Sequence, residues 1–358
     1  MTRLIRAVIH SGALRANLAT VKRFAPGARI LAVVKANAYG HGLVPTALAL
    51  ADADAFAVAR LEEGMALRSA GVRTPIVLLE GVFNAPQLEE AAHQDFELVV
   101  HGPEQVALLA DWRGAHRFNV WLKIDSGMNR LGFRPEEFPA AHNALAESAA
   151  VAPRMRLLTH LANADALGDP VTTEQIALFE RTVTGFTLER SIANSAGILG
   201  WPASHTDWVR PGLMLYGVSP LAGRTAADFG LRPAMTLLST VIATRRVRPG
   251  ERVGYGGCWT ARRATTLAIV AVGYGDGYPR HIANGTPALV NGARASVAGR
   301  VSMDMVALDV TDLPTVHVGA SVVLWGEGLP AETVAPHADT VPYELLCGVS
   351  QRVALELE

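Results

Sequence analysis

Lys35 is the first residue of the chain whose position could serve chemistry. It follows the short apolar run Leu31–Val34, and a loop with two glycines comes after it. Such a run predicts a buried strand that leads into a turn. Alternation along this strand would place Val33, Lys35 and Asn37 on one face. A buried lysine is unfavourable unless it is paired, neutralised or used covalently, so Lys35 is a candidate nucleophile or base; the alternative is a lysine that reaches solvent.

A second basic group stands at the end of another apolar run. Trp121, Lys123 and Asp125 alternate along it, which predicts one strand face for all three. Arg130 follows in a glycine-containing loop, and its planar guanidinium is suited to binding a carboxylate. A plain ion pair between Lys123 and Asp125 is the alternative interpretation.

Two later segments contain residue types that bind anions. Asn194 and Ser195 stand at a predicted helix start, where hydroxyl and backbone N–H groups hold anions, although serine is also an ordinary helix cap. Arg210 precedes Pro211. It is therefore either a ligand-binding cation or a surface residue at a strand edge.

The local sequence around His160 and Tyr255 gives weaker evidence of a functional role. His160 ends an apolar run, and a lone histidine there is more often a core residue than a catalyst. Tyr255 lies between glycines, as aromatic residues in turns often do. The glycines of Gly273–Gly277 do not have the spacing of a dinucleotide-binding loop, and no helix is predicted after them.

Predicted strands alternate with helical stretches over residues 30–217 and would position these side chains. The strands are Ile30–Ala36, Phe56–Arg60, Pro75–Gly81, Phe96–Val100, Phe118–Asp125, Met155–Ala162, Ser191–Asn194 and Trp208–Gly217. Helical spacing lies between most of them, as in Leu61–Ala70 and Thr172–Thr187. Eight such units predict a (β/α)8 barrel, with a doubly wound open sheet as the alternative. A phosphate commonly lies over the last two strands of such a barrel, where Gly212 and Leu213 would offer backbone N–H groups.

After about Leu231 the pattern changes to strands separated by turns. The predicted strands are Met235–Val247, Thr265–Val272, Pro287–Val290, Ser302–Val310 and Ser321–Leu324. Turn signals such as Asn291-Gly292 separate them, with little helical spacing. We therefore predict a barrel domain over residues 1–231 and a mostly β domain over residues 232–358, with residues 1–10 able to pair with the β domain.

The composition is that of a compact globular protein. Half of the 358 residues are hydrophobic and 18% are charged. The net charge of −1 disfavours a nucleic-acid partner, and no apolar run has the roughly 20 residues of a membrane span. Cys258 and Cys347 predict neither a disulfide framework nor a metal site. The N-terminus has no signal-peptide pattern, so we expect a cytoplasmic protein.

Segments in order along nearly the whole chain resemble those of the bacterial alanine racemases, fold-type III enzymes that use pyridoxal 5′-phosphate (PLP). The segments are Leu31–Gly42, Trp121–Gly132, Leu157–Asp165, Ser191–Gly197, Trp208–Gly217, Val253–Gly257, Gly299–Met305 and Val341–Cys347. The resemblance implies an isomerase that interconverts L-alanine and D-alanine, either for peptidoglycan precursors or for alanine breakdown. It also implies a homodimer with shared active sites.

The resemblance assigns chemical roles to the strongest candidates. Lys35 would form the Schiff base with PLP and act as the base toward D-alanine, and the partner's Tyr255 would act toward L-alanine. Arg130 would contact both the cofactor and the substrate carboxylate. Arg210 would bind the pyridine nitrogen, with His160 beside it. The remaining expected cofactor contacts are Tyr39, Asn194, Ser195, Gly212, Leu213 and Tyr343.

Other residues would support the site. Met303 would approach the substrate near Asp304, and Tyr274 would line the entrance. Lys123 would carry a carbamate that attracts Arg130 rather than repelling it. Ser191 departs from those family members that have a histidine in its place.

Three other functions are alternatives to an alanine racemase. A racemase of broader specificity would have the same fold. A decarboxylase with the same barrel is disfavoured, because nothing in the sequence replaces the pair Arg130 and Tyr255. A non-catalytic PLP-binding protein made of a single barrel is disfavoured by the second domain.

Overall fold

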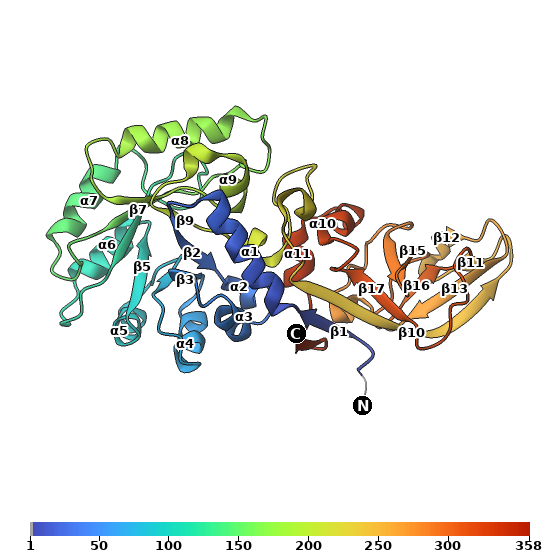
Figure 1. The fold of residues 1–358 in the computed structure, drawn as a ribbon. Helices are drawn as coiled ribbons and strands as arrows, with labels where there is room; N and C mark the ends of the chain where they lie inside the picture. The colour runs from blue at the N-terminus through green and yellow to red at the C-terminus, as the bar shows by residue number, and fades with distance from the viewer. Residues whose placement is uncertain (1–2) are drawn as a thin grey trace.

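A closed barrel of parallel strands and a β domain lie side by side in the computed structural model, which describes residues 3–358 (Figure 1). This confirms the predicted (β/α)8 barrel followed by a mostly β domain. None of the described helices is long and apolar enough to cross a membrane.

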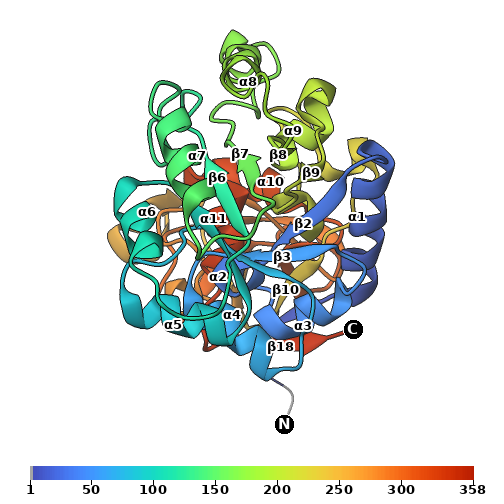
Figure 2. The ribbon, with the colours of Figure 1, turned by 90° about the vertical axis from the view of Figure 1, so that its left-hand side faces the viewer.

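The barrel contains eight short parallel strands that pair in chain order. They are β2 (Arg29–Val33), β3 (Ala55–Val58), β4 (Ile76–Leu78), β5 (Phe96–Val100), β6 (Val120–Lys123), β7 (Arg156–Leu158), β8 (Glu189–Ser191) and β9 (Trp208–Val209). Helices surround these strands, as Figure 2 shows. The helices are α1 (Ser11–Phe24), α3 (Leu43–Ala49), α4 (Leu61–Ser69), α5 (Ala85–His93), α6 (Pro103–Ala110), α7 (Phe138–Glu147), α8 (Pro170–Thr182) and α9 (Ser195–Gly200).

Several strands end earlier than the sequence pattern predicted. The first barrel strand ends at Val33, and the next residues form the short helical segment α2 (Lys35–Tyr39), so Asn37 does not share a strand face with Lys35. The eighth strand stops at Val209, and a 3-10 helix, η2 (Leu213–Tyr216), follows. Apolar composition marks buried backbone without distinguishing a strand from a buried turn, which explains both errors.

A network of charged and aromatic side chains fills the barrel at the N-terminal ends of its strands. Arg156 lies at its centre, with Nη1 2.9 Å from Glu97 Oε2 and Nε 2.9 Å from Glu189 Oε2. The indole N–H groups of Trp121 and Trp208 donate to Glu97 at 2.6 Å and to Glu189 at 3.0 Å. This network, which we call the barrel floor, leaves the opposite end of the barrel for a ligand.

The β domain is one large sheet whose strands follow the order β13, β16, β15, β14, β17, β10, β1, β18. Its strands are β1 (Arg6–Ile9), β10 (Met235–Val247), β13 (Thr265–Val270), β14 (Pro287–Val290), β15 (Ala293–Val297), β16 (Val306–Asp309), β17 (Ser321–Trp325) and β18 (Ala354–Leu357). The long strand β10 pairs with both β13 and β17, so six strands form a closed circuit. Strand β1 pairs antiparallel with β10, which joins the start of the chain to this domain.

Details of the β domain differ from the predicted pattern. Strands β15 and β18 were not predicted, and β16 begins at Val306 rather than at Ser302, so Met303 lies before the strand. The Asn291-Gly292 turn does join β14 to β15, and both residues have positive φ, 48° and 82°. The small strands β11 (Arg252–Val253) and β12 (Trp259–Thr260) form a separate hairpin.

The C-terminal region also contains short helices that the sequence pattern did not predict. They are α10 (Ala331–Val334), the 3-10 helix η6 (Ala335–Ala338) and α11 (Pro342–Cys347). Helix α11 lies directly against α2: a Cβ added at Gly40 would be 2.2 Å from the Leu346 carbonyl oxygen (Figure 1). The end of the β domain therefore reaches the mouth of the barrel on the same chain.

Candidate active site

A cavity of about 510 Å³ opens at the C-terminal ends of the barrel strands. This is the end where barrel enzymes place their chemistry. Most of the predicted site residues line it: Lys35, Tyr39, Lys123, Arg130, His160, Asn194, Ser195, Arg210, Gly212, Leu213 and Tyr343. They come from segments spread over 309 residues of the chain, from 35 to 343, and only the closed barrel and the docking of α11 bring them together.

Lys35 stands at the point where strand β2 ends and an unusual turn begins. The next four residues, 36 to 39, have φ between 52° and 54°, although none is glycine. This left-handed turn also buries Tyr39, whose ring stacks on Tyr216 with centroids 4.7 Å apart. The hydroxyl of Tyr216 donates to the Val33 carbonyl at 2.9 Å. The aromatic pair therefore fixes the turn to the end of the strand that delivers Lys35.

Ser195 and Gly212 form a small cradle that fits a phosphate group. The Ser195 hydroxyl oxygen accepts hydrogen bonds from the N–H groups of Gly212 at 2.8 Å and Met214 at 3.3 Å, so its own proton remains free to donate. A Cβ at Gly212 would lie 2.6 Å from the Tyr39 hydroxyl oxygen, so any larger residue would fill the cradle. Tyr343 lies beside it, with its ring centroid 5.8 Å from that of Tyr39.

Asn194 lines the cavity and also caps a helix. Its side-chain oxygen accepts from the Gly197 N–H at 2.9 Å and caps helix α9. Its amide nitrogen lies 3.4 Å from the Leu161 carbonyl oxygen. Asn194 therefore orients the helix start that presents Ser195.

Arg210 is held rigidly in the cavity wall. Nη1 donates to the Ser191 hydroxyl at 2.6 Å, and Nη2 donates to the carbonyls of Thr159 at 2.5 Å and Ile192 at 3.1 Å. Burial lowers the pKa of Arg210 to about 10, which leaves it charged at neutral pH. Nε makes no hydrogen bond within residues 3–358, so its N–H is free to donate to a ligand.

His160 lies beside Arg210 and is neutral. Its Nδ1 is 3.4 Å from Arg210 Nη2. Burial, followed by the charges of Arg210, Lys123, Arg130 and Lys35, lowers the pKa of His160 well below its ordinary value. An uncharged ring can accept from the guanidinium without adding another positive charge to the cavity.

The cavity contains an excess of positive charge. Burial, then the guanidinium groups of Arg210 and Arg130, lower the pKa of Lys123 to about 8 against the opposing effect of Asp125. The alternative ion pair between Lys123 and Asp125 is absent from the described residues. Instead, Asp125 Oδ1 accepts from the backbone N–H groups of Gly127 at 2.9 Å and Asn129 at 3.0 Å. The arrangement is suited to an anionic ligand with a phosphate and a carboxylate.

Four predicted site residues lie outside this cavity, on the β domain. Tyr255 begins the 3-10 helix η4 (Tyr255–Gly257) between β11 and β12, at the end of the domain far from the barrel (Figure 1). Its side chain is 67% exposed. Tyr274 and Met303 are also exposed, and the Tyr274 N–H donates to the Ser302 carbonyl at 3.1 Å. Asp304 accepts a hydrogen bond from Arg352 at 2.6 Å.

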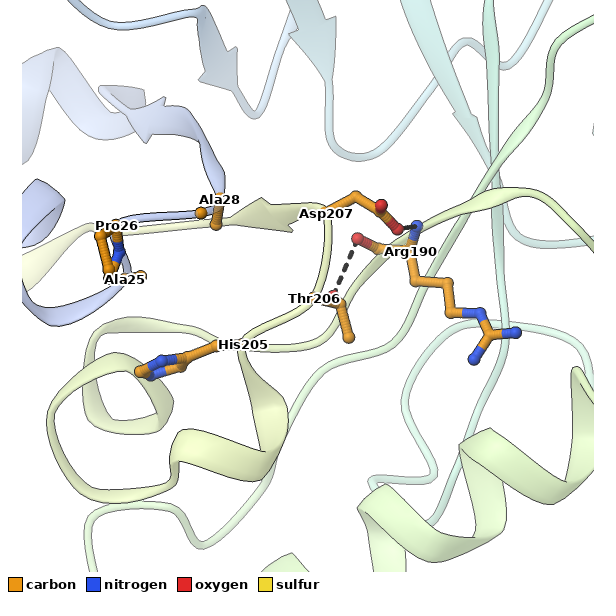
Figure 3. Close-up of a pocket in the computed structure, with 8 residues that line it drawn as sticks. Ala25, Pro26, Ala28, Arg190, His205, Thr206 and Asp207 are labelled. Atoms are coloured by element: carbon orange, nitrogen blue, oxygen red, sulfur yellow. Dashed lines mark hydrogen bonds between the residues drawn. The ribbon is translucent and has the colours of Figure 1, made fainter.

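A second hollow at the other end of the barrel has no comparable chemistry. It lies where β2, β8 and β9 begin, and Figure 3 shows its lining. The Asp207 carboxylate accepts from the Arg190 backbone N–H at 2.8 Å, and the Thr206 hydroxyl donates to the Arg190 carbonyl at 2.9 Å. The guanidinium of Arg190 points away and pairs with Glu180. These polar groups bond one another and stabilise the loop rather than a ligand.

Sequence reasoning missed several residues in or beside the cavity, including Glu80, which lines it. Glu63 contacts the backbone immediately after Lys35, and Cys347 lines the cavity from α11. An acidic residue in the first turn of a predicted helix indicates a helix start, but it does not indicate contact with a turn 27 residues earlier. Across the described residues, no cluster of three or more histidine, cysteine or acidic side chains could hold a metal ion.

Comparisons with family models match almost the whole chain. Residues 9–220 match the alanine racemase N-terminal domain, and residues 234–357 match the alanine racemase C-terminal domain. The chain is 51% identical over 350 residues to the alanine racemase of Aeromonas hydrophila, covering 98% of each chain. It is 48% identical to the biosynthetic alanine racemase of Escherichia coli K12, with the same coverage of both.

Solved structures show the same arrangement of both domains. The biosynthetic alanine racemase from Pseudomonas aeruginosa superposes with a TM-score of 0.97 at 46% identity, covering 100% of each chain. The alanine racemase from Bartonella henselae, solved with covalently bound pyridoxal phosphate, superposes with a TM-score of 0.89 at 30% identity, also covering 100% of each chain.

Proposed function

The chain belongs to the alanine racemase family and interconverts the enantiomers of alanine, and from this premise we propose that it does so with PLP and two bases in a dimer. The observation that carries the proposal is one cavity that contains Lys35, the Ser195–Gly212 cradle and the free donor of Arg210. We also propose that the chain consists of two domains, a barrel domain over residues 1–231 and a β domain over residues 232–358. The unpaired cysteines support a cytoplasmic location.

The residues present fit PLP. Ser195 and the backbone at Gly212 and Leu213 would hold the phosphate, with Asn194, Tyr39 and Tyr343 around them. Lys35 would hold the cofactor covalently through Nζ. Arg210 Nε would donate to the pyridine nitrogen, with neutral His160 behind it. When bound, PLP would supply an electron-withdrawing ring that makes the α-proton of the amino acid acidic.

Arg210 would also limit the chemistry to racemisation. An arginine donates a hydrogen bond but does not give up its proton, so it leaves the pyridine nitrogen unprotonated. Three carbonyl and hydroxyl acceptors hold the guanidinium in place, which leaves it no room to turn away. An unprotonated ring accepts less negative charge, which favours return of a proton to Cα over transamination.

Lys35 and the partner's Tyr255 would act on opposite faces of the α-carbon. Lys35 would remove or return the proton of D-alanine, and the tyrosine would do so for L-alanine. Arg130 would hold the substrate carboxylate by its guanidinium fork. Tyr255 is exposed and lies between β11 and β12, two strands far from the barrel of the same chain (Figure 1), which supports its use by a second subunit. Met303, Asp304 and Tyr274 would approach the same entrance from that subunit.

Replacing Lys35 tests the proposal directly. Lys35→Ala should abolish racemisation, measured by circular dichroism with L-alanine, and should lose the covalently bound cofactor. The chain has only three lysines, Lys22, Lys35 and Lys123, so borohydride reduction followed by peptide mass spectrometry identifies the attachment point without ambiguity. Lys22→Ala, at an exposed position on α1, is the matched control.

Two outcomes would contradict this assignment. One is normal racemase activity in Lys35→Ala, and the other is wild-type cofactor trapped on Lys123 or Lys22. Comparable turnover of amino acids larger than alanine would instead support the broader-specificity racemase. Cofactor trapped on Lys35 without any turnover would support the non-catalytic PLP-binding protein.

A further inference from the structure

The turn that follows Lys35 has a strained backbone and depends on contacts with other residues for its stability. Residues 36 to 39 are alanine, asparagine, alanine and tyrosine, and all four have left-handed φ angles. This conformation is unfavourable for L-residues by roughly 1–2 kcal/mol each. Such a turn persists only where surrounding groups hold it, and turns of this kind concentrate at functional sites.

Glu63 holds the first peptide of this turn. Its Oε1 accepts from the Ala36 N–H at 2.6 Å, and its Oε2 accepts from the N–H groups of Ala59 at 2.9 Å and Arg60 at 3.3 Å. One carboxylate thereby links the start of α4 to the residue directly after Lys35. Hydrogen bonds to an ionised acceptor are about twice as strong as neutral ones.

This contact restrains the direction in which Lys35 points. The Ala36 N–H belongs to the peptide plane formed by the Lys35 carbonyl, so rotation about the ψ angle of Lys35 would break the bond to Glu63. The far end of the turn is held separately, since His41 Nδ1 lies 2.9 Å from the Tyr39 carbonyl oxygen and 3.1 Å from that of Ala38. Burial lowers the pKa of His41 to about 4, so the ring is neutral and donates to these carbonyls.

We propose that Glu63 is a positioning residue that aims Lys35 for proton transfer on the D-alanine side. The inference rests on the proposed role of Lys35 as a base. Glu63 itself does not line the cavity, so it acts through the backbone at Ala36 and not by touching the substrate. A displacement of about 1 Å in a reacting group can lower a rate by about a hundredfold.

The test uses holoenzyme of Glu63→Ala with Glu62→Ala as its control. Glu62 is the preceding residue on α4, is exposed, and carries the same charge near the same helix end. We expect kcat/KM to fall about tenfold to a hundredfold in Glu63→Ala and to stay at the wild-type value in Glu62→Ala. The two enantiomers have equal free energies, so kcat/KM must fall equally in both directions and cannot reveal which base is affected.

Isotope effects with alanine deuterated at Cα identify the affected base. If Lys35 is misplaced, its proton transfer becomes slower than that of Tyr255. The primary isotope effect on kcat/KM should then rise for deuterated D-alanine and fall toward unity for deuterated L-alanine. A loss of activity through general loosening of the fold would not separate the two substrates in this way.

The inference is overturned if the two isotope effects remain at their wild-type values or shift in the opposite sense. If Glu63→Ala does not fold, Glu63→Gln is measured in the same way, because an amide makes fewer of the three contacts while keeping the size of the side chain. An active Lys35→Ala enzyme would refute the proposed function itself. Loss of activity in Lys35→Ala, together with unchanged isotope effects in the Glu63 variants, would refute only the role of Glu63.

Discussion

At the scale of single residues, lysine and arginine side chains outnumber acidic ones in the cavity, where Glu80 is the acidic residue among the lining residues. Lys35, Lys123, Arg130 and Arg210 all line one cavity, and the nearest acid in sequence, Asp125, is used to cap a loop. Two of the three lysines in the chain therefore line this cavity. Burial and neighbouring charge lower the pKa of Lys123 to about 8, so part of it is an uncharged amine near neutral pH.

An uncharged buried amine is the form that reacts with dissolved carbon dioxide, which supports a carbamate on Lys123. The new N–C bond would turn the amine into an anionic acceptor for Arg130, with release of one proton. We predict that Lys123→Ala lowers kcat/KM about 10- to 100-fold, corresponding to one charge-assisted hydrogen bond of roughly 1.5–3 kcal/mol. Added acetate should restore part of the activity.

A crystal grown near neutral pH provides the direct measurement. Electron density for three extra atoms on Lys123 Nζ would support the carbamate. A bare ammonium, with Arg130 held by some other group, would refute it. Lys22→Ala again serves as the control, and acetate should leave its activity unchanged.

At the scale of elements, one end of the barrel forms a cavity and the other end is filled by side chains that pair with one another. The C-terminal ends of the strands carry the cavity, whereas the N-terminal ends carry the barrel floor centred on Arg156. Glu189 in β8 receives hydrogen bonds from Arg29 of β2, Trp208 of β9 and Arg156 of β7. It thereby links the consecutive strands β7, β8 and β9 to β2, the first strand of the barrel. Partial burial raises the pKa of Glu189, but these hydrogen bonds outweigh it and lower the pKa to about 2.

The low pKa of Glu189 in the barrel floor leads to a prediction about the stability of the fold at acid pH. The pKa of Glu189 is lower in the folded than in the unfolded chain, so its contribution is fully present above about pH 4.5 and is lost as pH falls toward about 2. Glu189→Gln should therefore be less stable than wild type at pH 7, and the difference should shrink as the pH decreases from 4.5 to 2. Urea unfolding followed by circular dichroism across this range measures it.

The control for this experiment is Glu136→Gln, which removes an exposed acid in the loop before α7. It should have little effect on the free energy of unfolding at any of these pH values. If Glu189→Gln lowers the free energy of unfolding by the same amount at pH 3 and pH 7, then size and packing, not ionisation, determine how this residue stabilises the fold.

At the scale of the whole molecule, a single chain presents half of each proposed active site. The barrel of one chain has Lys35, while Tyr255 belongs to the segment between β11 and β12, two strands that lie at the end of the β domain far from the barrel (Figure 1). Tyr255, Tyr274, Met303 and Met305 are all exposed on that domain. A second copy of the chain would complete the site.

Mixing two inactive variants tests this arrangement. Lys35→Ala and Tyr255→Phe should each be inactive as homodimers. In a mixed dimer one site would have both lesions and the other would have neither. Random exchange at equal concentrations should therefore restore about a quarter of wild-type activity, because half of the dimers are mixed and each has one intact site of two.

The matched control replaces Tyr255→Phe with the double variant carrying both substitutions, which offers no intact site in any combination. Subunit exchange is verified by native mass spectrometry with one isotopically labelled chain. Failure to recover activity after verified exchange would place both bases on the same chain.

The sequence by itself determined the order of elements and the residue types of the site. Eight apolar runs that alternate with helical spacing specify the barrel, because buried parallel strands need continuous apolar residues and crossover helices. Strand bounds such as Met235–Val247 and Pro287–Val290 match the observed β10 and β14. The motif around Lys35 correctly placed this residue near the C-terminal end of its strand, although the strand ends at Val33 and not at Ala36 as predicted.

Only the tertiary structure decided how these residues meet. The left-handed turn after Lys35 has no glycine to indicate it, and its first peptide depends on a contact with Glu63, which lies 27 residues later in the sequence at the start of α4. The docking of α11, which brings Tyr343 to Tyr39, was likewise absent from the sequence pattern. Local residue types determine periodicity and therefore elements, whereas strained turns and shared cavities depend on contacts between segments that no local pattern records.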